Sequence, residues 1–115
     1  EAFARFFKVE YLDTNSQRAT RAIAWCSFLT GKDEQAQRYY DRLLQQGKVR
    51  HEDYTNAAHV KWIVGNRSQA IELYKKAASM CSKEQFEQLM KQDEKVLIER
   101  GASKFELMLL RDLIE

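Results

Sequence analysis

Apolar positions along the chain recur at intervals of three and four residues, with polar residues between them. In the segment 83–100, Phe86, Leu89, Met90 and Leu97 fall on one stripe that only Asp93 interrupts, which is the pattern of an amphipathic helix. The same pattern predicts helices at about 1–13, 16–30, 34–46, 52–64, 67–80, 83–100 and 104–114, with boundary errors of roughly two to four residues. Almost nothing is left over for strands.

Turn and capping residues separate these helices. The chain has no proline and only four glycines, Gly31, Gly47, Gly65 and Gly101, and each glycine follows an apolar-periodic stretch. This placement is typical of a helix C-terminus. The segments 82–85 (SKEQ) and 103–106 (SKFE) have the form of a capping box, in which the serine accepts a hydrogen bond from the third helical amide. The starts of the last two helices are therefore the best defined.

A shift of 34 residues brings two parts of the chain into register. The coinciding residues are Ala24 and Ala58, Gly31 and Gly65, Gln35 and Gln69, Ala36 and Ala70, and Tyr40 and Tyr74. Most of them are small, aromatic or turn residues. A fixed period of this length is typical of a helix-turn-helix unit stacked on copies of itself, and such arrays act by presenting a surface. The expected function is therefore binding.

Two segments of this register, AWCSFLTGKDEQAQRYYDRLL and AHVKWIVGNRSQAIELYKKAA, resemble the tetratricopeptide repeat. That family's pattern includes a small residue before a glycine turn, an alanine five residues after it and an aromatic residue four further on. Thr20 and Tyr54 stand in place of the family's frequent tryptophan, and its closing proline is absent. The resemblance implies an all-α fold, a tetratricopeptide-like α-solenoid of about three antiparallel helix pairs in a right-handed superhelix.

We expect residues 1–115 to form one domain of a larger protein. The expected division is a truncated repeat that supplies only its second helix at 1–14, two repeats at 16–47 and 51–81, and a divergent terminal helix pair at 82–115. The last unit is divergent because Gly101 arrives two residues later than the period requires. Terminal repeats are often atypical, since one of their faces has no neighbour.

Composition narrows the class of partner. A formal net charge of +2, with basic and acidic residues interspersed, is too small to indicate nucleic-acid binding. A pentatricopeptide-like RNA binder is also disfavoured, because it would have a period of 35 and repeated polar specificity residues. No run of about eighteen apolar residues predicts a membrane span. Cys26 and Cys81 are expected to be buried free thiols, which favours a cytoplasmic location, although a removed leader stays open.

No constellation of residues predicts chemistry. His51 and His59 are eight residues apart in the sequence, two helical turns, which is too far for a shared metal ion. Cys26 has no histidine in its own unit, and no glycine-rich phosphate loop occurs. We expect no catalytic residues, no cofactor and no metal, and hence a protein that is not an enzyme.

The resemblance also implies that the first helices of the units line a concave groove. The groove residues expected from it are Arg21, Trp25, Phe28, Thr55, Asn56, His59 and Trp62. Trp25 and His59 are the expected contacts, with Arg21 and Asn56 holding polar groups of the partner. For Phe28 and Trp62, and for Leu29 and Ile63 beside them, packing in the core is the favoured interpretation.

The sequence thus predicts a protein–protein interaction module that binds a peptide or partner segment in a concave groove, without catalysis. The alternative is a structural or self-association domain of a larger regulatory protein. Phe3, Phe6 and Phe7 would form an exposed patch in the truncated first unit, and such a patch could pair with a second copy.

Overall fold

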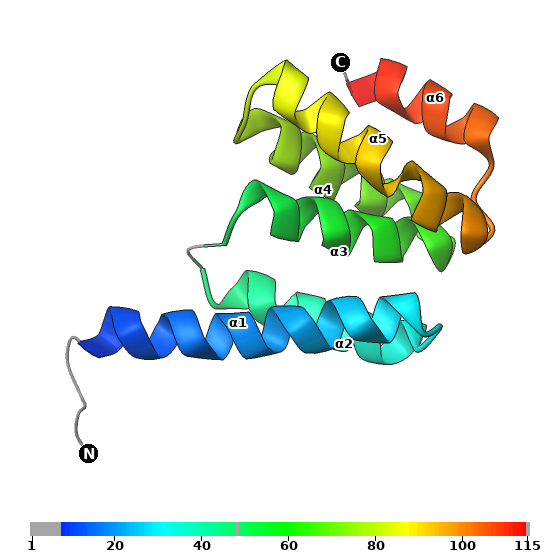
Figure 1. Cartoon of the computed structure of the whole chain (residues 1–115). Helices are drawn as coiled ribbons and strands as arrows, with labels where there is room; N and C mark the ends of the chain where they lie inside the picture. Colours follow the sequence, from blue (N-terminus) through cyan, green and yellow to red (C-terminus); the bar gives the residue numbers. More distant parts are fainter. Residues whose placement is uncertain (1–7, 48, 115) are drawn as a thin grey trace.

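Every regular element in the described part of the chain is an α-helix. The computed structural model describes residues 8–47 and 49–114, with side chains from Gln17 onward. The helices, shown in Figure 1, are α1 (Lys8–Leu29), α2 (Asp33–Gln45), α3 (His51–Ile63), α4 (Arg67–Ser79), α5 (Lys83–Glu99) and α6 (Lys104–Ile114). The predicted all-α fold class is confirmed for these residues.

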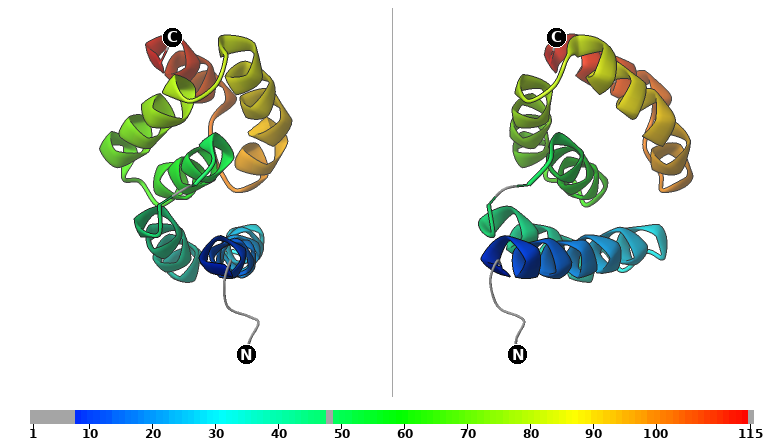
Figure 2. Two further views of the ribbon diagram at one scale, coloured as in Figure 1. Left: turned by 90° about the vertical axis from the view of Figure 1, so that its left-hand side faces the viewer. Right: turned by 60° about the vertical axis from the view of Figure 1, so that its left-hand side comes forward.

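Neighbouring helices pack on one another in chain order. α1 and α2 form one closely packed pair, α3 and α4 form a second, and α2 also packs on α3. α5 and α6 form a looser pair, and each of them also contacts α4. Figure 2 shows the α1–α2 pair at one end of the molecule and α6 at the other.

The predicted helix boundaries hold for α2 to α6, each to within one residue. The predicted break between residues 13 and 16 is wrong, because α1 runs without interruption from Lys8 to Leu29. Asp13, Thr14, Asn15 and Ser16 are residues that favour helix caps, yet none is a glycine or a proline. Cap-forming residues lower helix propensity by only a fraction of a kcal/mol each, so a helix can continue through them.

The turns that end the first helices have the same backbone geometry. The amide of the residue after each glycine donates to a carbonyl five residues back, in the pairs Lys32 to Ser27 (2.8 Å), Asn66 to Lys61 (2.9 Å) and Ala102 to Leu97 (2.9 Å). This is the Schellman motif, which needs a left-handed residue before the donor. Gly31 and Gly65 supply it with φ of +81° and +94°. The glycines predicted as C-caps therefore end these helices.

Residues 34 positions apart are buried in matched pairs. The fully or almost fully buried pairs are Ala24 and Ala58, Ala36 and Ala70, and Tyr40 and Tyr74. The residues before α2 and α4 match as well, with φ and ψ of −89° and 71° at Lys32 and −90° and 72° at Asn66. The 34-residue register is thus a structural repeat of the α1–α2 and α3–α4 pairs.

Candidate functional site

Arg21 and Asp53 form an ion pair between α1 and α3, on the face where the groove was expected. Arg21 Nε and Nη2 donate to the two carboxylate oxygens at 2.6 and 2.7 Å, and the Asp53 side chain has no exposed surface. The hydrogen bond to Asp53 raises the pKa of Arg21 above its usual value. Asp53 also accepts from the Arg50 amide at 3.0 Å. The Arg21 cation is therefore already paired within the fold.

His59 is fully buried, so the expectation that it is an accessible contact is wrong. Its Nδ1 lies 2.6 Å from Tyr74 Oη on α4, and its Nε2 lies 2.9 Å from Asp93 Oδ2 on α5. A neutral imidazole that donates from Nε2 to the carboxylate accepts the tyrosine hydroxyl at Nδ1. Burial, and then the charge of Asp93, raises the pKa of Tyr74 well above its usual value. His59 joins three helices and is structural.

Trp25 stands in the first unit where His59 stands in the second. It is half-buried, with its ring centroid 5.5 Å from that of Phe28. Tyr40, the counterpart of Tyr74, has a buried hydroxyl that makes no well-formed hydrogen bond in the described part of the chain, although the Asn56 side chain lies close enough to offset part of the rise in its pKa. Burial is the main reason that the pKa of Tyr40 is raised, ahead of the charge of Asp53. The first unit therefore lacks the hydrogen bond that His59 makes in the second.

Phe28 and Trp62 are buried between helices, which confirms the favoured interpretation that they belong to the core. Arg100, at the end of α5, lies 4.9 Å from the Phe28 ring and donates to the Phe28 carbonyl oxygen at 2.8 Å and to Asp33 at 2.9 Å. The end of α5 thus covers the turn between α1 and α2. Leu29 is exposed, contrary to expectation.

The remaining expected groove residues divide between the core and the surface. Thr55 is fully buried, and its hydroxyl donates to the His51 carbonyl oxygen at 3.0 Å. Ile63 is half-buried and packs against the core. Asn56 is partly exposed, as are Arg21 and Trp25. The accessible part of the expected groove is therefore reduced to these last three side chains.

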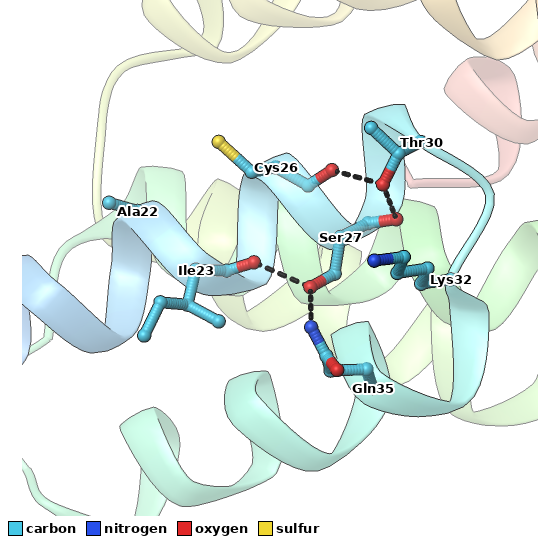
Figure 3. Close-up of a pocket in the computed structure, with 7 residues that line it drawn as sticks. All are labelled: Ala22, Ile23, Cys26, Ser27, Thr30, Lys32 and Gln35. Atoms are coloured by element: carbon cyan, nitrogen blue, oxygen red, sulfur yellow. Dashed lines mark hydrogen bonds between the residues drawn. The ribbon is translucent and has the colours of Figure 1, made fainter.

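One face of α1 is covered by no helix in the described part of the chain. We call the exposed residues Ala22, Ile23 and Cys26 the α1 face, whereas Ser27 at its edge is buried. Ile23 is 41% exposed and Cys26 is also exposed, so the expectation of a buried Cys26 thiol is wrong; Cys81 is partly exposed. An open hollow of about 390 Å³ lies at this face, and Figure 3 shows the residues that line it. Its lining residues are Ala22, Ile23, Cys26, Ser27, Thr30, Lys32 and Gln35.

The hydroxyl groups of this hollow are hydrogen-bonded to other groups that line it. Ser27 Oγ donates to the Ile23 carbonyl oxygen at 2.7 Å and accepts from Gln35 Nε2 at 2.7 Å (Figure 3). Thr30 Oγ1 donates to the Cys26 carbonyl oxygen at 2.8 Å. With these hydroxyls satisfied, the surface that the hollow offers is mainly the apolar part of Ile23 and the Cys26 side chain.

A second apolar surface lies on α6, at the other end of the molecule. We call it the α6 stripe, and it consists of Phe105, Met108, Leu109 and Leu113, which are 48–68% exposed. The opposite side of α6 buries Leu107 and Leu110. A hollow of about 230 Å³ separates the stripe from α4, and Arg67 and Glu106 form an ion pair of 2.9 Å there.

Sequence reasoning missed both surfaces, although α6 carried a signal. Phe105, Leu109 and Leu113 are spaced by four residues, and Leu107, Leu110 and Ile114 are spaced by three and four. A helix that is apolar on two faces needs a partner on each of them. The α1 face carried no such signal, since Cys26 was expected to be buried.

In the described residues, no group of three or more histidine, cysteine, aspartate or glutamate side chains is placed to hold a metal ion. No helix in this part of the chain is both long enough and apolar enough to cross a membrane. Comparison with protein-family models gave no match, and neither the curated proteins nor the solved structures gave one.

Proposed function

We propose that this chain is a protein–protein interaction module of a larger cytoplasmic protein, with no chemistry of its own. In this proposal the helices belong to a tetratricopeptide-like α-solenoid with a right-handed superhelix, which acts as a scaffold for a protein or peptide partner. The matched turns and matched buried residues of the first two helix pairs support the repeat. Repeat arrays of this kind present extended surfaces for binding.

The observation that carries the proposal is the exposed apolar surface on single helices. Four large apolar side chains of α6 are about half exposed or more, and Ile23 of the α1 face is 41% exposed. Isolated apolar residues on a surface need no explanation, but contiguous apolar patches mark sites of protein interaction. The buried polar side chains Asp53 and His59 are, by contrast, paired with other side chains of the fold.

The concave groove remains part of the proposal in a smaller form. Trp25 is a large amphipathic side chain that stays partly exposed, as do Arg21 and Asn56. An aromatic anchor flanked by polar groups fits a bound segment of extended or helical peptide. Arg21 serves there through the exposed edge of its guanidinium group, since Asp53 occupies the inner donors.

The second candidate function is self-association of the larger protein. The patch first proposed for it, Phe3, Phe6 and Phe7, lies outside the described residues. The α6 stripe now favours this candidate independently, because an exposed apolar helix face can pair with a second copy of the chain.

The test is to isolate a partner with the wild-type chain and then to measure its affinity by calorimetry for three variants. Trp25→Ala alters the concave side, Leu109→Glu alters the α6 stripe, and Glu72→Ala is the control on the exposed side of α4. We expect one of the first two changes to weaken binding about tenfold or more, while Glu72→Ala leaves it unchanged. A partner that responds only to Glu72→Ala would overturn both surfaces.

A further inference from the structure

The exposed side of α6 carries two adjacent rows of residues, each with a spacing of four. All members of both rows are exposed, and they are Lys104, Met108 and Asp112 in the first row and Phe105, Leu109 and Leu113 in the second. Residues four apart in a helix lie one above the other on the same face. The α6 stripe is therefore accompanied by a cation near one end of the helix and an anion near the other.

Lys104 and Asp112 form no ion pair in the part of the chain that the structure describes. The neighbouring Glu106, by contrast, is paired with Arg67 at 2.9 Å. Asp112 follows Met108 by four residues within an otherwise apolar surface. A partner that covers this surface must supply a cation opposite Asp112, because an unpaired charge is costly to bury.

A second copy of α6 supplies that cation when the two helices lie antiparallel. A two-fold axis perpendicular to both helices keeps each row on its own side, so each row meets the same row of the second copy in reverse order. With the axis at the middle of the rows, Lys104 lies beside Asp112 of the second copy, and Phe105 lies beside its Leu113. A parallel pair would place Lys104 against Lys104 and Asp112 against Asp112, and like charges repel. The exposed side of α6 is thus complementary to itself in one orientation.

The second row adjoins the hollow between α6 and α4. Leu109 and Leu113 line this hollow of about 230 Å³ together with Trp62 and Ile71. Phe105 is 68% exposed, the largest fraction among the large apolar side chains that the structure describes. In the antiparallel pair its ring lies beside Leu113 of the second copy, at the edge of that copy's hollow. Each copy therefore offers one projecting ring and one hollow, as an isologous interface requires.

We infer that α6 pairs with α6 of a second copy, antiparallel and about a two-fold axis, so that the chain forms a weak homodimer. This inference rests on self-association, the second candidate function, and specifies its surface and geometry. The exposed apolar side chains of α6 offer about 400 Å² in each copy. The pair thus buries roughly 800 Å² of apolar surface, less than the 1,200–2,000 Å² or so of a standard interface. We expect a dissociation constant of about 10–1,000 μM, and no species larger than a dimer, because the contact closes on itself.

The experiment is sedimentation velocity of the wild-type chain and charge-reversal variants from about 10 μM to 1 mM. Lys104→Glu and Asp112→Lys each replace two ion pairs of the symmetric dimer by two contacts between like charges. We expect each variant alone to dimerise at least about tenfold more weakly than the wild type. Both residues are exposed, so the fold survives, which circular dichroism verifies. Lys91→Glu, an equal charge reversal at an exposed position of α5, is the control and should dimerise like the wild type.

An equimolar mixture of the two variants provides the decisive measurement. In a dimer with one copy of each, opposite charges meet again at both ends, so the mixture should return to about the affinity of the wild type. The double variant Lys104→Glu/Asp112→Lys exchanges the two charges and should recover alone. Absence of recovery in both cases overturns the inference, as does a wild-type dimer that Leu109→Glu leaves unchanged. A wild type that stays monomeric at millimolar concentration also overturns it, while capture of a different partner by the α6 stripe or by Trp25 would still stand.

Discussion

His59 and Asp93 are separated by one repeat period of 34 residues and are joined by a hydrogen bond of 2.9 Å. Trp25 lies one period before His59 and occupies the same position in α1. The hydrogen bond links α3 to α5, whereas the matching position of α1 carries an aromatic side chain.

Removing His59 should destabilise the fold strongly. His59→Ala takes away the partner of Tyr74 Oη and of Asp93 and leaves a cavity among α3, α4 and α5. We expect the free energy of unfolding to fall by about 2–4 kcal/mol, measured by urea denaturation. His51→Ala, on a partly exposed side chain of the same helix, is the control and should change it by about 0.5 kcal/mol or less. Equal effects of the two would show that the His59 network is not formed.

The two repeat tyrosines should respond in opposite directions to loss of the hydroxyl. Tyr74→Phe removes a hydrogen bond to His59 and should cost about 1–2 kcal/mol. Tyr40→Phe removes a buried hydroxyl whose contact with Asn56 falls short of a well-formed hydrogen bond, so stability should stay the same or rise by up to about 1 kcal/mol. Thermal melts of the two variants provide the comparison. A loss of stability in Tyr40→Phe as large as in Tyr74→Phe would contradict the assignment.

The same tyrosines should make the fold sensitive to alkali. Their pKa values in the folded protein are raised above the ordinary value of 10.0, so the folded state holds these protons more tightly than the unfolded state does. Their contribution to stability is complete below about pH 10 and is lost as pH rises above it. We expect the urea midpoint to fall in that range, and tyrosinate absorbance from these two residues to appear only with unfolding. Early ionisation of Tyr74 without unfolding would contradict its burial.

The turn after α3 should not tolerate a β-branched residue. Gly65 has φ of +94°, and a Cβ there would contact nothing within 4 Å, so the cost of Gly65→Val is one of backbone conformation rather than of space. We expect a loss of about 1–3 kcal/mol. Gly65→Asn should cost less, because asparagine adopts the left-handed region more readily. A higher calorimetric melting temperature for Gly65→Val than for Gly65→Asn would refute this interpretation of the turn.

Much of the fold could be predicted because its signals are local. Glycine turns, the capping box at Ser82, and alanine and tyrosine positions at a fixed spacing each depend on a few neighbouring residues, and the structure confirms them. The continuous α1 was missed because four cap-forming residues without a glycine or proline do not suffice to end a helix.

The environment of the expected site residues could not be predicted, because it depends on contacts between distant helices. His59 reads as an accessible polar residue until Tyr74 and Asp93, 15 and 34 residues away, are seen to bond to it. Arg21 likewise reads as a free cation until Asp53 is placed against it. Burial of a polar side chain is favourable only when its partners are present, and no pattern along one helix identifies those partners.

The Arg21–Asp53 pair should stabilise the fold strongly, so a binding test with Arg21 variants must also measure their stability. Arg21→Ala removes the cation from a buried carboxylate that also accepts from the Arg50 amide, and loss of one partner of a buried ion pair costs about 3–5 kcal/mol. Arg21→Lys keeps the charge but loses the two parallel hydrogen bonds, so it should fall between wild type and alanine. Arg67→Ala breaks the exposed pair with Glu106 and should change stability far less. Urea denaturation measures all three. If Arg21→Ala instead folds with undiminished stability and weakens partner binding, then Arg21 acts on the partner directly, and its pairing with Asp53 is not what holds α1 on α3.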